Sequence, residues 1–455
     1  MARRALLALI FFPRGGSAQV ARYLAGALPA SGWEATIACG SLGAVGEESN
    51  AATFYGALDV RALDYTAAAQ APDPLRADPP FQPSYEDRAG APDRIFTSVD
   101  DTDYERLVET WIDHLGRAGA ATADVLHLHH LTPLNEAAER AFSAVPRVGH
   151  LHGTELLMLR EIDEGPPEGW DHAAAWAERM RRWAQGCERL FVLSPDAVRR
   201  VPAMLGVDPG RVVWAPNGFD PVGFQRRPVC GSARVDQWRK WLVEEPRGWD
   251  RSAKPGSVAY SEDQLEPFKE GGVLLYVGRY TEVKRIPLLI RAHARARGTF
   301  DRPAPLVLLG GFPGEWEGPH PLDVVRETGD DHVFLAGWRG HADLPDGLNA
   351  ADLLVLPSVR EQFGQVLVEA MACGLPAIAV DAHGPAEIVD DGETGWLVPP
   401  DDEDAMVEAL SEAVNGDTER RRRGDAAMAA ARGRYSWPAL AREVAATYDA
   451  VVDAR

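Results

Sequence analysis

Short apolar runs rich in Val, Ile and Leu recur along the whole chain, and each is followed by a polar turn and a segment with helical periodicity. The runs are continuous, which predicts strands that are covered on both faces and therefore belong to parallel sheets. Strands that alternate with helices need right-handed crossovers, so the pattern predicts doubly wound α/β domains. The runs of the first half read ALLALIFF, EATIACG, DVLHLHH, RVGHLHG, RLFVLSP and RVVWAPNG. Those of the second half read GVLLYVGR, APLVLLGG, VFLAGW, ADLLVLPS, LPAIAVD and TGWLVPP.

A polar stretch divides these runs into two sets. The chain has 455 residues, which is too long for one ordinary hydrophobic core and predicts two domains. Residues 225–271 hold four prolines and lack the strand pattern, so we expect them to connect the domains. Trp238, Trp241 and Trp249 lie in this stretch, and we expect part of it to pack on a domain. Residues 66–103 form a second irregular segment, for which a flap and a disordered loop are both open.

Composition argues against several classes of partner. The net charge is −21, from 47 basic and 68 acidic residues, and nucleic-acid affinity comes mainly from phosphate neutralisation. No apolar run reaches the ~20 residues of a membrane-spanning helix, whereas peripheral membrane association stays open. The first residues, MARRALLALIFFPRGG, lack the cleavage pattern of a signal peptide. The four cysteines show no C-x-x-C spacing. They indicate a reducing compartment, and we expect a cytoplasmic protein.

Two features of the first half lie at the carboxyl ends of predicted strands. In FFPRGGSAQV, Gly15 and Gly16 follow the first strand and precede a helix, where the backbone can approach an anion at the helix N-terminus. The loop matches neither the dinucleotide fingerprint nor the Walker loop, and a plain tight turn stays open. His152 follows another strand and precedes Gly153. Sites in open α/β sheets form at such positions.

Histidines cluster on two neighbouring runs, HLHH and HLHG. Residues i and i+2 share one face of a strand, so His127 with His129, and His150 with His152, are expected to line one face. A H-x-H pair can bind zinc, and a metal-dependent hydrolase using His127, His129 and His152 is one alternative function. No clear pattern of carboxylate ligands follows the later first-half strands, so we expect no metal site.

Successive strands of the second half end in Gly, Arg, Lys or Glu. In VGRYTEVKR, Arg279 and Lys284 follow the first of these strands, where two cations can hold a diphosphate. Gly310 follows the next strand, and in REQFGQVLVEAMACG the carboxylates of Glu361 and Glu369 flank seven residues at a strand-to-helix joint. Such groups around the mouth of a parallel sheet are typical of a nucleotide site.

Taken in order, these segments resemble a retaining nucleotide-sugar glycosyltransferase of family 4, which has the GT-B fold. The resemblance covers nearly the whole chain and is strongest over residues 273–399. Glu361 and Glu369 are similar to the family's E-x7-E pair, whereas Arg285 stands where the family usually has glycine. The motifs that carry the resemblance are the Gly15-Gly16 loop, HLHG, LSP, PNGFD, YVGRYTEVK, FLAGW, LPSVREQFGQVLVEAMACGLPAIA and GPAEIVDDGETGWLV.

The resemblance implies two doubly wound, Rossmann-like α/β domains that face a cleft. Residues 1–225 would form the acceptor-side domain, and residues 272–435 would bind the nucleotide sugar. Residues 226–271 would connect the two domains. A last helix of about 436–455 would pack back on the first domain.

The resemblance also implies a role for each matching residue. Arg279 and Lys284 would bind the donor's diphosphate, and Glu361 would bind hydroxyls of its sugar. Glu369 would accept bonds from the ribose, and His152 would contact the sugar or the reacting centre. The other implied donor-binding residues are Gly15 and Gly310, then Gly16 near the phosphate, Trp338 and Arg339 facing the base, and Phe363, Gly364, Gln365 and Val366 with backbone around the sugar and phosphates.

The implied activity is that of a hexosyltransferase, which moves a sugar from a nucleoside-diphosphate sugar to a hydroxyl group of a soluble acceptor. A UDP-sugar is favoured and a GDP-sugar stays open. Two cations and helix N–H dipoles can stabilise the leaving diphosphate, so neither a metal nor another cofactor is expected. The resemblance favours a front-face route in which the leaving phosphate takes the acceptor's proton. A sugar-nucleotide epimerase of the same fold and a non-catalytic sugar-nucleotide-binding protein are the remaining alternatives.

Overall fold

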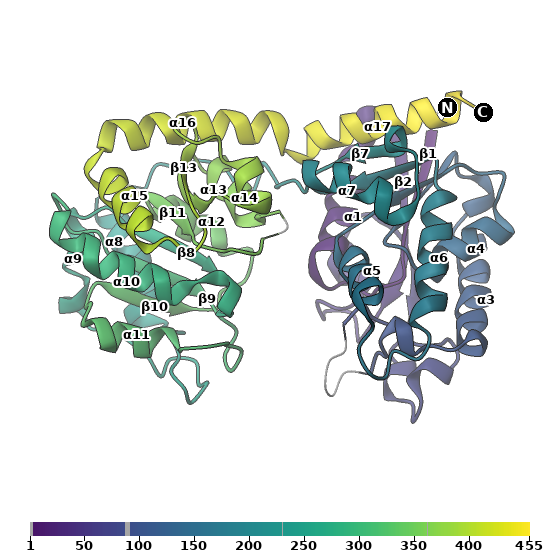
Figure 1. Cartoon of the computed structure of the whole chain (residues 1–455), viewed down its shortest axis with the longest axis horizontal. Coiled ribbons are helices and arrows are strands. Elements are labelled where there is room, and N and C mark those ends of the chain that lie inside the picture. The colour runs from purple at the N-terminus through teal and green to yellow at the C-terminus, as the bar shows by residue number, and fades with distance from the viewer. Residues whose placement is uncertain (1–2, 87–91, 230, 362) are drawn as a thin grey trace. The chain divides into compact units, whose positions relative to one another are not determined.

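The computed structural model (Figure 1) describes residues 3–86, 92–229, 231–361 and 363–455. The chain forms two compact units, Met1–Asn217 with Trp437–Arg455, and Gly218–Ser436. Each unit holds one parallel sheet with helices packed on it. Every apolar run predicted to form a strand contains one, so the α/β architecture predicted from those runs is confirmed.

The first unit is built on a 7-stranded sheet in the order β3-β2-β1-β4-β5-β6-β7. The order reverses between β1 and β4, and open α/β sheets form ligand sites at the carboxyl ends beside such a reversal. Its strands are β1 Arg3–Leu9, β2 Trp33–Ser41, β3 Asp59–Asp64, β4 Val125–His129, β5 Arg147–His150, β6 Arg189–Val192 and β7 Val212–Trp214. Its helices are α1 Gly15–Ala27, α2 Ala51–Tyr55, α3 Asp101–Arg117, α4 Pro133–Ala141, α5 Thr154–Glu164, α6 Ala173–Gln185, α7 Pro195–Leu205 and α17 Trp437–Asp453, with short 3-10 turns at Leu28–Ser31, Ala68–Gln70, Pro74–Arg76, Phe96–Ser98, Ala120–Thr122 and Pro209–Arg211.

Alternate residues of β1 enter two hydrophobic clusters. Leu6 and Ala8 belong to one cluster, and Ala5 and Leu7 belong to the other. Since neighbouring residues of a strand point to opposite faces, both faces of the sheet are covered here, which explains the continuous apolar run. The edge strand β3 is different, because Leu63 is its only buried residue. It therefore has no continuous apolar run and was not predicted.

The second unit is built on a 6-stranded sheet in the order β10-β9-β8-β11-β12-β13, which reverses between β8 and β11. Its strands are β8 Leu274–Gly278, β9 Leu306–Gly310, β10 Val333–Gly337, β11 Leu353–Leu356, β12 Ala377–Val380 and β13 Gly395–Val398. Its helices are α8 Ser232–Arg239, α9 Pro267–Glu270, α10 Ile286–Ala296, α11 Pro321–Thr328, α12 Leu344–Ala350, α13 Gln365–Ala372, α14 His383–Ile388, α15 Glu403–Asn415 and α16 Asp417–Arg434. A π-helical turn spans Lys240–Glu244, and 3-10 turns span Glu262–Leu265, Glu282–Lys284 and Arg297–Thr299.

Residues 226–271 are part of the second unit, so the prediction that they connect the domains is wrong. The side chains of Trp238 and Trp249 are fully buried in the core of that unit. Their indole N–H groups donate to the carbonyl oxygens of Ala350 at 3.1 Å and Gly311 at 2.8 Å. Burial of these aromatic rings outweighs the polar, proline-containing composition that suggested a linker.

The described parts of the segment 66–103 pack on the first sheet. Phe81 and Phe96 are buried in the same cluster as Leu6, and the side-chain oxygen of Gln82 accepts a bond from the backbone N–H of Phe12 at 2.9 Å. The disordered loop is therefore excluded for these parts, while residues 87–91 of the segment lie outside the described residues.

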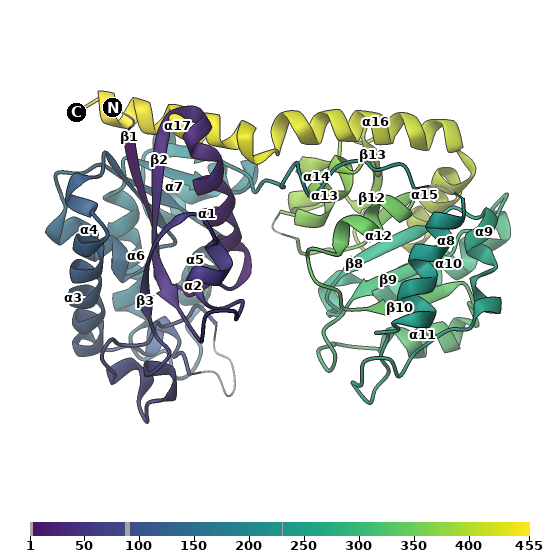
Figure 2. The same ribbon diagram turned by 180° about the vertical axis from the view of Figure 1, so that it is seen from behind.

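The last helix, α17, completes the first unit (Figure 2). Its Trp437 ring stacks on Tyr23 of α1 with centroids 5.8 Å apart, and its Tyr448 ring meets Trp33 edge-on at 4.9 Å. The carboxylate of Asp449 pairs with Arg3 of β1 at 2.7 Å. None of the described helices combines the length and the apolar character that crossing a membrane requires.

Candidate active site

An ion pair marks the reversal of strand order in the second sheet. Lys284 lies in the 3-10 turn after β8, and Glu361 lies in the loop after β11. The ammonium of Lys284 binds the carboxylate of Glu361, and the two side chains are 13% and 22% exposed. Two predicted residues that are 77 positions apart in sequence therefore meet at the carboxyl ends of adjacent strands, where ligands of such sheets bind.

A cavity of about 560 Å³ opens at the carboxyl ends of β8, β9 and β10. Its lining includes Arg279, Gly310, Trp338 and Arg339, which were predicted. The predicted Gly310 has φ +122°, and a Cβ there would lie 2.3 Å from the carbonyl oxygen of Gly278. Only glycine fits this close backbone approach, so the cavity floor depends on it.

Two aromatic rings line this cavity while remaining open to solvent. Phe312 is 52% exposed and Trp338 is 45% exposed. Their ring centroids lie 5.9 Å apart at an interplanar angle of 72°. Exposed rings in a polar chain are suited to stacking on a flat ligand group. Phe312 was not predicted, although it follows Gly310 and Gly311 in the motif LLGGFPG.

Arg339 lines the cavity but its guanidinium group is already bound. It donates to the carbonyl oxygens of Trp241 at 3.1 Å and Glu245 at 2.5 Å. Burial, together with the neighbouring Arg247, lowers its pKa to about 10. The main role of Arg339 in this structure is to hold residues 240–245 against the cavity wall.

The segment that follows Glu361 opens helix α13. Gly364 is the N-cap with φ +98°, and it offers no side-chain bond to the first N–H groups of the helix. Those N–H groups, beginning with Gln365 and Val366, are therefore available to an anion. Phe363 is buried against Tyr435 with ring centroids 6.0 Å apart, so its side chain anchors the loop and leaves only its backbone for a ligand.

Glu369 lies inside α13 and is 2% exposed. Its carboxylate oxygen accepts a bond from the amide of Gln365 at 3.0 Å and contacts the imidazole of His341 at 2.9 Å. His341 also lines the cavity described above. Sequence reasoning missed His341, because a histidine after the FLAGW motif stood in no recognised pattern.

Arg285, at the position where the resembling family usually has glycine, adopts the left-handed conformation with φ +51°. This backbone conformation costs a non-glycine residue about 1–2 kcal/mol. The guanidinium group of Arg285 binds Asp401 at 2.5 Å and the carbonyl oxygen of Glu282 at 2.8 Å. These contacts hold the turn that carries Lys284.

The first unit has its own cavity, of about 440 Å³, beside the reversal between β1 and β4. The predicted Gly15, Gly16 and His152 all line it. A Cβ at Gly16 would meet no other atom within 4 Å, so the backbone there faces open space. The N-cap of α1, Arg14, gives no side-chain bond to the helix, and its guanidinium instead pairs with Asp93 at 2.7 Å.

Four histidines form a ladder at this cavity: His127 and His129 of β4 and His150 of β5 are buried, and His152, which follows β5, is partly exposed. His129 contacts His152 at 2.9 Å, His127 contacts His150 at 3.1 Å, and His127 also binds the hydroxyl of Tyr448 on α17. Burial lowers the pKa of each of these four imidazoles, to about 3 for His150. They are therefore neutral at pH 7 and act as hydrogen-bonding groups.

Three of these residues, His127, His129 and His150, place ligand atoms within 4.8 Å of one another. Their ring planes are 3° to 16° from parallel. The nitrogen lone pairs lie in the ring planes, so parallel rings do not aim them at one tetrahedral centre. This stacking gives no support to the metal-hydrolase alternative. The three histidines that come together also differ from those of the hydrolase alternative, which named His152 where the structure has His150.

Comparison with known families and proteins identifies relatives of both units. Residues 260–429 match the family described as glycosyl transferases group 1, and residues 14–222 match the one described as glycosyltransferase family 4. The chain is 34% identical over 345 residues to D-inositol 3-phosphate glycosyltransferase of Stackebrandtia nassauensis, covering 73% of this chain and 69% of the relative. It is 33% identical to the same-named protein of Kribbella flavida, covering 71% and 70%.

Solved structures agree with this architecture. Sucrose-phosphate synthase from Thermosynechococcus elongatus superimposes with a TM-score of 0.67 at 19% identity, covering 100% of both chains. HepE of Anabaena, solved with UDP and glucose, superimposes with a TM-score of 0.62 at 18% identity, covering 98% of this chain and 100% of that one. At these identities the likeness shows the fold alone, and that fold is GT-B.

Proposed function

Because the chain belongs to the group 1 glycosyl transferases, enzymes that transfer sugars, we propose that it moves a sugar from a nucleoside-diphosphate sugar to a hydroxyl group of a soluble acceptor. The proposal includes retention of the anomeric configuration. A UDP-sugar is the favoured donor, because the structurally similar HepE was solved with UDP. A GDP-sugar is the second candidate, and the two are separated by the binding panel described below.

The observation that carries the proposal is the grouping of Lys284, Arg279 and Glu361 with the open N-terminus of α13. These groups lie at the carboxyl ends of β8 and β11, the place where a parallel sheet binds nucleotides. A bound diphosphate would compete with Glu361 for the ammonium of Lys284. Glu361 would then be free to accept bonds from sugar hydroxyls, so the ion pair of the free enzyme is the resting form of two binding groups.

Two further features support a nucleoside site beside the diphosphate. The exposed rings of Phe312 and Trp338 offer a stacking surface for a base. Glu369, oriented by Gln365 and His341, offers a carboxylate oxygen to ribose hydroxyls. In this arrangement the nucleoside lies toward β9 and β10, and the diphosphate lies toward α13.

In the proposed reaction, the bond between the anomeric carbon and the diphosphate oxygen breaks on the same face on which the acceptor oxygen bonds to that carbon. The acceptor's proton goes to the departing phosphate oxygen. Negative charge grows on the diphosphate in the transition state, and Arg279, Lys284 and the N–H groups of α13 stabilise it. The proposal requires no metal and no further cofactor.

The cavity of the first unit is the proposed acceptor side. The relatives named above act on D-inositol 3-phosphate, and a polyol or its phosphate is accordingly the first acceptor to test. The uncapped N-terminus of α1, reached through Gly15 and Gly16, can receive an anion or a hydroxyl oxygen. His152 is neutral here and can hydrogen-bond a sugar hydroxyl.

A thermal-shift panel of UDP-, GDP- and other nucleotide sugars tests the donor, since specific binding raises the melting temperature by mass action. The best donor is then incubated with and without inositol phosphates, and the products are followed by NMR of the anomeric proton. Retained transfer with acceptor supports the proposal. Conversion of the donor without acceptor identifies an epimerase, and binding without turnover identifies a sugar-nucleotide-binding protein. Activity abolished by a chelator would favour the hydrolase.

A further inference from the structure

A second cavity of the second unit lies at the opposite edge of its sheet. It has a volume of about 410 Å³, which is within the usual range for small-molecule sites. Two of its lining residues, Asp352 and Pro376, directly precede β11 and β12, and Gly271 comes just before β8. The candidate active site is at the carboxyl ends of these strands, so the two cavities are separated by the length of a parallel sheet.

The lining of this cavity, which we call the basic cavity, is rich in cations. Two carboxylates line it, Glu270 and Asp352. The whole chain shows the reverse balance, with 47 basic and 68 acidic residues. A local excess of cations in an acidic protein focuses a positive field in the cavity. The lining cations are Arg226, Arg234, Lys269, Arg302, Arg420 and Arg421.

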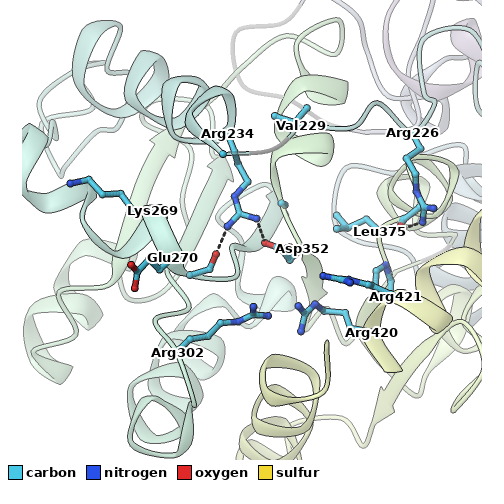
Figure 3. A pocket seen from close by; sticks show the side chains of 15 residues that line it. Arg226, Val229, Arg234, Lys269, Glu270, Arg302, Asp352, Leu375, Arg420 and Arg421 are labelled. Carbon is cyan, nitrogen blue, oxygen red and sulfur yellow. Dashed lines mark hydrogen bonds and ion pairs between the residues drawn. The ribbon is translucent and has the colours of Figure 1, made fainter. Parts of the chain in front are cut away.

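The guanidinium groups come from separate segments and meet around one space (Figure 3). In this view the ends of Arg302, Arg420 and Arg421 point toward the same space, whereas Lys269 points away. Arg302 and Arg420 share the single carboxylate of Asp417. Within the part of the chain that the structure describes, Arg421 has neither a hydrogen-bond nor an ion-pair partner. The cations at the centre are therefore under-compensated.

The arginines are held in place by the backbone. Arg420 donates to the carbonyl oxygens of Ala413 at 2.6 Å and Val414 at 3.1 Å. Arg226 donates to the carbonyl oxygen of Gly374 at 3.1 Å, and a Cβ at Gly374 would lie 2.2 Å from that guanidinium. Arg234 pairs with Asp352 at 2.7 Å. A ligand would meet cations that are already positioned, which lowers the entropy cost of binding.

Arg420 and Arg421 also lie in the first turns of α16, an 18-residue helix. The positive end of the helix dipole is unfavourable for cations and favourable for an anion. Asp417 and Glu419 offset part of this charge, but Asp417 is shared between two arginines and Glu419 binds Arg422 and Arg423. The helix end therefore adds to the positive field at Arg421.

We propose that the basic cavity binds a compact polyanion that carries phosphate groups, at a site separate from the donor site. Planar guanidinium groups match phosphate oxygens in pairs. The described lining contains no aromatic ring to serve as a stacking surface for a base, which favours a sugar phosphate or inorganic polyphosphate over a nucleotide. This inference does not depend on the donor or acceptor proposed above.

Calorimetric titration of inorganic tripolyphosphate into the full chain tests the proposal. The titration is run with the chain saturated by UDP, so that the cations of the donor site are occupied, and UDP binding is recorded separately. We expect one tripolyphosphate site that weakens with salt. Arg421→Glu should weaken it at least about tenfold, the loss of one charge-assisted contact. Failure of UDP to bind would count against the donor proposal. The affinities of the wild type and Arg421→Glu for tripolyphosphate could still be compared.

The matched control is Arg432→Glu, which makes the same charge change at an exposed position of the same helix. It should change the affinity for tripolyphosphate less than twofold. If Arg421→Glu fails to fold, Arg421→Gln takes its place with an expected loss of about fivefold.

Three results would overturn the proposal. The first is the absence of a tripolyphosphate site in the UDP-saturated protein. The second is equal affinity in the Arg421 variant and the wild type. The third is an equal loss in the Arg421 and Arg432 variants, which indicates nonspecific charge attraction. Vesicles of phosphatidylglycerol are tested in parallel. If the wild type binds these vesicles through Arg421 and does not bind tripolyphosphate, the basic cavity recognises a membrane surface instead.

Discussion

The two sheets of this protein share a topology and differ in the chemistry at their carboxyl ends. At the reversal of the second sheet, the ammonium of Lys284 meets the carboxylate of Glu361, and the carboxylate of Glu369 contacts the imidazole of His341. At the reversal of the first sheet, neutral histidines stack behind an open glycine loop. The fold fixes where a ligand binds, and the side chains decide whether the place is suited to a charged leaving group or to hydroxyl groups.

Of all the changes considered, acid should produce the largest difference between the two units, because it should destabilise the first unit more than the second. The four ladder histidines have pKa values lowered by burial, so below pH 6.5 the unfolded chain binds protons that the folded unit does not. Stability then falls as pH falls, by about 1.4 kcal/mol per pH unit for each histidine and at most about 5.5 kcal/mol per pH unit for four. Hydrogen exchange of both units at pH 7.5 and 5.5 measures this.

The first unit should lose protection at pH 5.5 while the core strands β8 and β11 keep theirs. His320 and His332 in the second unit also have lowered pKa values, so a small decrease is expected there. Equal loss in both units, or none in the first, would contradict the destabilising role assigned to the ladder.

Substitution of Lys284 by alanine should abolish most of the sugar-transfer activity proposed for the candidate active site of the second unit. The variant loses a cation that is proposed to face the leaving diphosphate, and turnover should fall by about 10²-fold or more. Initial rates at saturating donor measure the effect. Lys254→Ala, at an exposed position of the same unit, is the matched control and should turn over normally. Near-normal turnover of Lys284→Ala would remove Lys284 from the site.

Glu369→Gln should affect binding and leave the chemical step nearly intact. The variant keeps the shape of the buried side chain but loses the carboxylate that is proposed to meet the ribose. We expect the donor KM to rise about tenfold, with kcat changed less than twofold. His341→Ala, which removes the partner at 2.9 Å, should give a smaller rise. A fall in kcat with an unchanged KM would exclude the ribose role.

Phe312→Ala should give the smallest effect of the series. Loss of one stacking surface costs about 0.5–1.5 kcal/mol, which is a rise in donor KM of about two- to tenfold. Steady-state kinetics with the donor and with its sugar-free nucleoside diphosphate measure it. Val222→Ala serves as control, since Val222 is also an exposed apolar residue of the second unit. An unchanged KM would remove Phe312 from the nucleoside site.

Much of the fold could be predicted because buried strands require apolar residues, and these residues are visible as runs in the sequence. Strands covered on both faces need continuous apolar runs, and every such run contains a strand. β3 has a single buried residue, Leu63, and so has no such run. The segment 226–271 was wrongly predicted to be a connection because its composition hides the residues that are buried. Its polar surface dominates the composition, while a few buried rings such as Trp238 and Trp249 decide where it packs.

The positions of candidate residues were predictable where motifs stand at strand ends, as with Arg279, Gly310 and Glu361, and their roles stay predictions. Contacts between motifs were not predictable, because they depend on side-chain direction. Examples are the ion pair of Lys284 with Glu361, the contact of His341 with Glu369, and the commitment of Arg339 to backbone carbonyls. The roles assigned to Gly15, Gly16 and His152 stay predictions, although all three line one cavity.

The membership of α17 in the first unit has a consequence for the order of synthesis. The second unit, Gly218–Ser436, is continuous in sequence, so all of it is synthesised before the residues that cover Trp33 and His127 are made. The first unit begins folding earliest and is finished last. A nonsense mutation just before Trp437 would delete none of Met1–Asn217 and would still leave that unit without the helix that seals its sheet.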